Sequence, residues 1–107
     1  MLVLPIKKKW FDMILSEEKK EEYREIKPYY TKRFQTIGLL DENGLPTTNI
    51  RRIILRNGYS STSDQVLVDV GIAIREGNPN LGAKPGEKYY VLMIRRKYHS
   101  VSFQRRC

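Results

Sequence analysis

Cysteine and histidine are almost absent from this sequence of 107 residues. Its one cysteine, Cys107, is the last residue, so the chain has no pair for an internal disulfide and no cysteine cluster for zinc. Its one histidine, His99, offers no pair of imidazole ligands, and we expect a surface role for it rather than a catalytic one. Glycine-rich phosphate-binding motifs are missing as well. We therefore expect neither a metal site nor a cofactor.

Long apolar runs are also missing. No stretch approaches the roughly 20 apolar residues that a membrane-spanning helix needs. The short apolar stretch at residues 1–6 is followed by Lys7, Lys8 and Lys9, whereas a signal peptide carries its charges first. These features predict a cytoplasmic protein that has no membrane partner.

Acidic residues are the minority charge, with 12 against 20 lysines and arginines, and the formal net charge is +8. A basic chain favours a polyanionic partner through Coulomb attraction and counterion release, although a basic composition also serves solubility. The charges are unevenly spread, because residues 88–107 contain six basic residues and no acidic one, while acids gather at residues 17–25. This asymmetry favours nucleic-acid binding.

The length corresponds to a single domain, residues 1–107, with one modest core. The clearest pattern is at residues 65–75, where valines and isoleucines alternate with other residues and predict a strand with one buried face. The other expected elements are strands at residues 2–6, 20–27, 50–56, 89–96 and 101–103, a helix at 7–16 and a short helix at 29–34.

Too few helices separate the later strands for a parallel sheet. We therefore predict a mainly β fold with α (α+β), namely a small, largely antiparallel barrel of about five to six strands. An N-terminal helix and a short second helix accompany the barrel.

The most informative segment for chemistry is residues 16–24, where the first helix passes into a strand. Glu22 and Arg24 are two residues apart on that strand, so they share a face and are able to pair or to hold a polar ligand together. Lys19, in the turn, is within reach of the same place. The alternative is a solvated edge with ordinary surface ion pairs, which contribute little.

At these residues the sequence resembles the ASCH domain family, phage and bacterial type, whose pattern is G-x-K-x-x-E-x-R between a helix and a strand. Lys19, Glu22 and Arg24 occupy the lysine, glutamate and arginine positions, and Glu17 stands at the glycine position. Segments at residues 10–12, 56–59, 77–82 and 89–91 extend the similarity over nearly the whole chain. The resemblance implies a PUA-like β-barrel with a cleft between barrel and helix.

The resemblance also implies RNA or nucleotide binding in that basic cleft. Lys19 and Arg24 suit phosphate or a base edge, and Glu22 suits an exocyclic amine such as that of cytosine. Trp10, Tyr23 and Tyr59 are candidates for stacking on an unpaired base. Lys8, Arg56 and Tyr59 complete the expected binding residues.

Two alternatives stay open. Some ASCH-like proteins hydrolyse the amide of N4-acetylcytidine with a turn lysine and a strand threonine. Here Lys19 matches the lysine and Glu22 stands at the threonine position, so these two would be the catalytic residues of an amidohydrolase. We expect the Glu22 carboxylate to favour the charged form of Lys19, which works against such a role. A protein-interaction module with a basic face is the second alternative.

Overall fold

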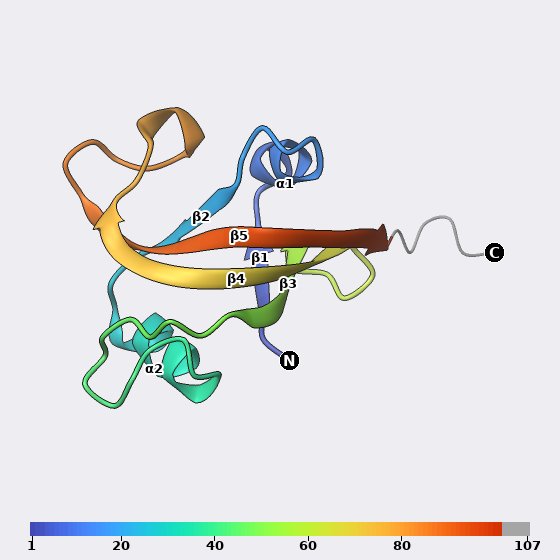
Figure 1. Ribbon diagram of the computed structural model, residues 1–107. Coiled ribbons are helices and arrows are strands. Elements are labelled where there is room, and N and C mark those ends of the chain that lie inside the picture. The colour runs from blue at the N-terminus through green and yellow to red at the C-terminus, as the bar shows by residue number, and fades with distance from the viewer. Residues whose placement is uncertain (102–107) are drawn as a thin grey trace.

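The computed structural model describes residues 1–101, with side chains described as far as Tyr98. This part of the chain holds five strands, two α-helices and one 3-10 turn (Figure 1). In chain order they are β1 (Val3–Ile6), α1 (Lys8–Leu15), β2 (Glu21–Arg24), α2 (Pro28–Thr36), β3 (Arg51–Asn57), β4 (Gln65–Glu76), η1 (Pro79–Leu81) and β5 (Lys88–Val101).

The five strands form one mixed sheet in the order β1-β3-β4-β5-β2. The pair β1–β3 is parallel, and the other three pairs are antiparallel. The two helices lie on opposite sides of the long β4–β5 ribbon (Figure 1). The structure is thus α+β and rich in strands, as the spacing of the elements predicted.

One main hydrophobic core lies between the sheet and both helices. Val66, Val68 and Val70 of β4 are buried in it, as the alternation at residues 65–75 predicted. Phe11 of α1 and Phe34 of α2 reach the same core. Burying apolar side chains from both helices against one curved sheet is the main stabilising contribution to such a small domain.

The backbone pairing of the sheet leaves two edges, β1 and β2, at the ends of the strand order. A side chain joins them, because the Arg24 Nη2 on β2 donates to the Pro5 carbonyl oxygen on β1 at 2.8 Å. The sheet therefore curls far enough to bring its edges within the reach of one arginine.

The observed boundaries correct the sequence predictions in two places. β2 ends at Arg24 rather than at residue 27, because Lys27 is the extended N-cap of α2 and Pro28 begins that helix. We expected a separate strand at residues 101–103, but Val101 belongs to β5. Residues 102 and 103 lie outside the described residues. β5 continues through the polar residues 95–97 because a register shift opposite Asp69 and Val70 accommodates an extra residue.

No helix of the described chain is long and apolar enough to cross a membrane.

Candidate functional site

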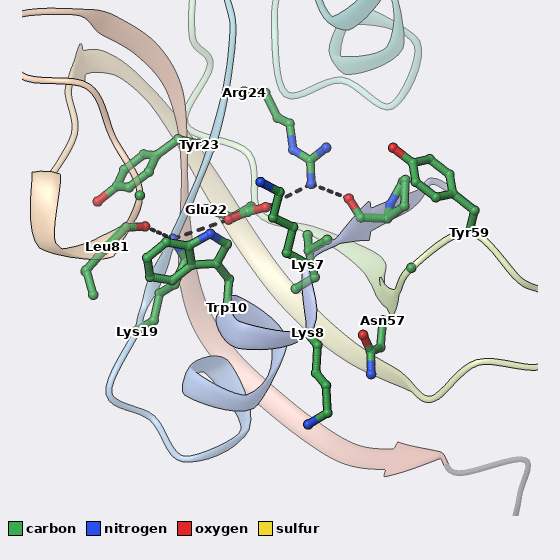
Figure 2. Close-up of a pocket in the computed structure, with 14 residues that line it drawn as sticks. Lys7, Lys8, Trp10, Lys19, Glu22, Tyr23, Arg24, Asn57, Tyr59 and Leu81 are labelled. Atoms are coloured by element: carbon green, nitrogen blue, oxygen red, sulfur yellow. Dashed lines mark hydrogen bonds and ion pairs between the residues drawn. The ribbon is translucent and has the colours of Figure 1, made fainter.

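A pocket of about 490 Å³ opens where the start of α1 meets the two edge strands. Its walls come from the end of β1, the first turn of α1, β2, the segment after β3 and the η1 turn (Figure 2). Five of the six predicted site residues line it, namely Lys8, Lys19, Glu22, Arg24 and Tyr59. The pocket thus brings together predicted site residues as far apart in the sequence as Lys8 and Tyr59.

A tight turn carries the chain from α1 into β2. The Lys19 amide donates to the Met13 carbonyl oxygen at 3.0 Å, and Glu17 has a φ of 66°, in the left-handed region. A non-glycine residue there costs about 1–2 kcal/mol, and glycine removes that cost. The position at which the resemblance to the ASCH pattern predicts a glycine is thus one whose φ favours glycine, although Glu17 occupies it.

Glu22 is held between two cations. Its Oε2 lies 2.8 Å from the Arg24 Nη2, and its Oε1 lies 3.4 Å from the Lys19 Nζ. All three side chains are largely buried, with exposed fractions of 1% for Lys19, 9% for Glu22 and 11% for Arg24. The prediction that these residues share one place is therefore confirmed, and the alternative of a solvated charged edge is wrong.

The ammonium of Lys19 is enclosed on several sides. It donates to the Leu81 carbonyl oxygen and lies 4.7 Å from the ring centroids of both Trp10 and Tyr23 (Figure 2). Burial lowers the pKa of Lys19, and the nearby Glu22 carboxylate only partly opposes this. We expected the Glu22 carboxylate to raise the pKa of Lys19. That expectation is wrong, because desolvation of the ammonium outweighs the ion pair.

Lys19→Met gives a test of this pKa direction. The unfolded chain binds more protons than the folded protein between the lowered pKa and the ordinary lysine value of 10.5. The stability of the native protein relative to Lys19→Met is therefore expected to rise with pH through that interval, since the cost of the buried ammonium disappears. Urea unfolding of both proteins at a series of pH values measures this difference. A difference that stays flat or falls with pH contradicts the assigned direction.

The η1 loop is fixed over the pocket by Tyr23. Its hydroxyl accepts from the Asn78 amide at 3.0 Å and donates to the Glu21 Oε1 at 2.7 Å, and burial raises the pKa of Tyr23 to about 12. The Tyr23 hydroxyl is therefore neutral at physiological pH and able to keep both bonds. This contact positions the Leu81 carbonyl above Lys19, which sequence reasoning could not foresee because Leu81 is 62 residues away.

Arg24 completes the interior of the site. Besides Glu22 and the Pro5 carbonyl, its guanidinium reaches the Tyr30 hydroxyl at 3.4 Å. Its Nε is buried and has no hydrogen-bond partner among the described residues. The interior thus retains acceptor capacity on Glu22, since a carboxylate offers about four lone-pair sites.

The rim of the pocket differs from the prediction. Lys8 points away from the interior and pairs with Asp12 at 2.6 Å, whereas Lys7, which the sequence analysis did not select, extends toward Glu22 and Arg24 (Figure 2). Tyr59 lies on the rim with an exposed fraction of 90%. Trp10 borders the pocket, but Lys19 occupies one of its faces, so Tyr59 offers the more accessible ring.

Arg56 does not line the pocket that gathers the other five predicted site residues. Ile53 and Leu55 of β3 face the core, so Asn57 shares their face and Arg56 points to the other one. The Arg56 Nε donates to the Gln65 Oε1 at 2.8 Å on the neighbouring strand, while Asn57 lines the pocket. The alternation of β3 contained the signal that would have found Asn57.

Glu22 is the single carboxylate among the described residues that line the pocket, and both its oxygens face cations. The lining therefore provides no set of metal ligands and favours an organic ligand with negative charge. Comparison of the chain with protein-family models, curated proteins and solved structures found no match. The chemistry of the pocket is thus the ground for assigning a function.

Proposed function

We propose that the protein is an RNA-binding module of the ASCH type, with a PUA-like curled sheet, whose pocket takes one nucleotide of a single strand. The observation that carries this proposal is the Glu22 carboxylate, fixed by Lys19 and Arg24 at the base of a pocket of about 490 Å³. Pockets of this size accommodate small organic ligands, and a few fixed polar groups give them specificity.

The charges around the pocket favour an anionic group. Lys7, Lys8, Lys19 and Arg24 line it, against the single carboxylate of Glu22. α1 also begins at the pocket with no side-chain cap and no acidic residue in its first turn. The free amide groups and the dipole of a helix start attract anions, whereas lysines there oppose the dipole. A phosphate at this place accepts hydrogen bonds from the free amide groups and reduces the repulsion among the lysines.

The base of the nucleotide is matched by the remaining groups. Glu22 has lone pairs left to accept from an exocyclic amine, as a carboxylate does from cytosine. The exposed Tyr59 ring provides a face for stacking, which contributes about 1–3 kcal/mol per base.

Tyr59→Ala tests this assignment with little risk to the fold, because the side chain is 90% exposed. We expect the substitution to weaken binding of cytidine 5′-monophosphate about tenfold, through the loss of stacking. The matched control is Tyr29→Ala, which removes a tyrosine that is 57% exposed on α2, outside the pocket. Isothermal titration calorimetry of both variants measures the effect. Equal affinities in the two variants, or no binding by the native protein, would refute the proposal.

An amidohydrolase acting on N4-acetylcytidine is the second candidate, and the lowered pKa of Lys19 favours it. Water would add to the acetyl carbonyl, and the C–N bond would break to give cytidine and acetate. The binding proposal predicts no cytidine release by chromatography, because the Lys19 side chain is only 1% exposed and its ammonium already contacts the Glu22 carboxylate and the Leu81 carbonyl oxygen. Turnover that Lys19→Met abolishes would establish the enzyme instead. A protein-interaction module predicts neither nucleotide binding nor turnover.

A further inference from the structure

Four cations outside the pocket lie next to one another across the sheet. Lys20, Arg52, Arg95 and Arg96 are all exposed, and we call them the basic row. The Ile94 amide donates to the Lys20 carbonyl oxygen at 2.9 Å, so Lys20 lies opposite Ile94 of β5, and its side chain lines a small groove together with Arg95 and Arg96. Arg96 pairs in register with Asp69 of β4, and Asp69 pairs with Arg52 of β3. The row therefore runs from strand to strand, over roughly 14 Å at the usual strand spacing.

A bulge in β5 brings two consecutive arginines to the same face. Val70 pairs with Ile94 and Asp69 pairs with Arg96, so Arg95 is the extra residue. A Cβ built on Gly71 would lie 3.8 Å from the Arg95 Nε, on the face that Asp69 and Arg96 share. In a regular strand Arg95 and Arg96 would point to opposite faces. Bulges re-aim side chains and are common beside functional sites.

The one carboxylate paired within the row, that of Asp69, already accepts hydrogen bonds from two neighbouring side chains. The Arg52 Nε donates to the Asp69 Oδ1 at 3.0 Å, and the Tyr98 hydroxyl donates to its Oδ2 at 2.7 Å. The Tyr98 ring centroid in turn lies 4.3 Å from the guanidinium carbon of Arg52 and 4.7 Å from that of Arg96. These contacts hold Arg52 and Arg96 in place, which lowers the entropy lost when they bind an anion.

The basic row adjoins the nucleotide pocket. A smaller groove of about 120 Å³ is lined by Lys20, Arg95 and Arg96. Lys19 lines both this groove and the pocket. Glu17 contributes one carboxylate to this groove. A chain that leaves the pocket past the turn at residues 16–20 therefore meets the row next.

We infer that the basic row binds the phosphate backbone of the same RNA strand whose nucleotide occupies the pocket. The inference rests on the proposed function and extends it, because it makes the ligand an oligonucleotide rather than a free nucleotide. Arginines bind phosphate through paired N–H donors, and each phosphate contact on a single strand adds about 0.7 to the salt dependence of log K. The pocket supplies base recognition, and the row supplies affinity that is independent of sequence.

The double variant Arg95→Ala/Arg96→Ala tests the row. We expect about tenfold weaker binding of a single-stranded RNA of about ten nucleotides, and a salt slope smaller by about 1.4. Cytidine 5′-monophosphate binding should change by less than about twofold, since neither arginine lines the pocket. The control is Lys32→Ala/Lys88→Ala, which removes the same charge from exposed positions outside the row and the pocket.

The outcomes separate the row from the pocket. If the native protein binds the mononucleotide and the RNA equally well, or if both double variants lose the same affinity for RNA, the row is refuted while the pocket stands. If the native protein binds RNA through the arginines but binds no mononucleotide, the pocket assignment fails and the row stands. If the native protein binds a poly-glutamate peptide as tightly as it binds the RNA, and Arg95→Ala/Arg96→Ala loses that peptide binding, the row serves an acidic protein and the inference is overturned.

Discussion

Glu22→Ala is expected to destabilise the protein by about 3–5 kcal/mol, the usual cost of removing one partner from a buried ion pair. Glu22 lies between Lys19 and Arg24, and the side chains of all three are at least 89% buried. Without the carboxylate, two cations face each other in a site largely closed to water. Because Arg24 also joins β2 to the Pro5 carbonyl of β1, the loss extends to the seam between the sheet edges. Urea unfolding monitored by circular dichroism measures the change.

The control for this prediction is Glu25→Ala, which removes a carboxylate of the same chain segment that is 60% exposed. Its ion pair with Lys27, at 3.1 Å, is a surface contact and should contribute less than about 1 kcal/mol. If Glu22→Ala and Glu25→Ala cost the same, the Glu22 carboxylate is not the buried centre of the site.

Gly82→Ala is expected to destabilise the protein by about 2–5 kcal/mol and to weaken nucleotide binding. Gly82 has a φ of 104°, a conformation that costs other residues about 1–2 kcal/mol. A Cβ there would lie 3.0 Å from the Trp10 Cζ2, and overpacking of this kind typically adds about 1–3 kcal/mol. The pushed Trp10 ring also covers Lys19, so the shape of the pocket changes with it.

Gly86→Ala separates the two contributions. Gly86 has a φ of 79°, and a Cβ added there meets no atom within 4 Å. This variant therefore carries the backbone cost alone, about 1–2 kcal/mol, and should leave nucleotide affinity unchanged. Equal destabilisation in Gly82→Ala and Gly86→Ala, with equal affinity, would show that contact between Gly82 and Trp10 does not shape the pocket.

The centre of the site could be predicted from local sequence. Glu22 and Arg24 share a face because they are two apart on a strand, and the turn places Lys19 over them. The burial of the site could not be predicted, since the Leu81 carbonyl and the Tyr23–Asn78 contact come from a loop far along the chain. This burial lowers the pKa of Lys19, whereas the sequence predicted that Glu22 would raise it.

The fold was predictable where periodicity is strong and unpredictable where one residue changes the register. The buried valines of β4 follow from alternation alone. The bulge in β5 does not, because a single extra residue at Arg95 leaves no mark in the pattern of apolar residues. In a regular strand the side chains of residues 95–97 would alternate between the two faces, whereas the bulge gathers Arg95 and Arg96 on one face.

The most direct measurement follows the indole N–H of Trp10 by NMR during titration with cytidine 5′-monophosphate. Trp10 is the sole tryptophan of the sequence, so its signal is unambiguous, and it borders the pocket beside Lys19. Nucleotide binding in the pocket predicts a saturable shift of this signal that becomes weaker as salt is raised. A signal that stays unmoved up to about 10 mM nucleotide, where even weak binding would be seen, would contradict the assignment of the pocket.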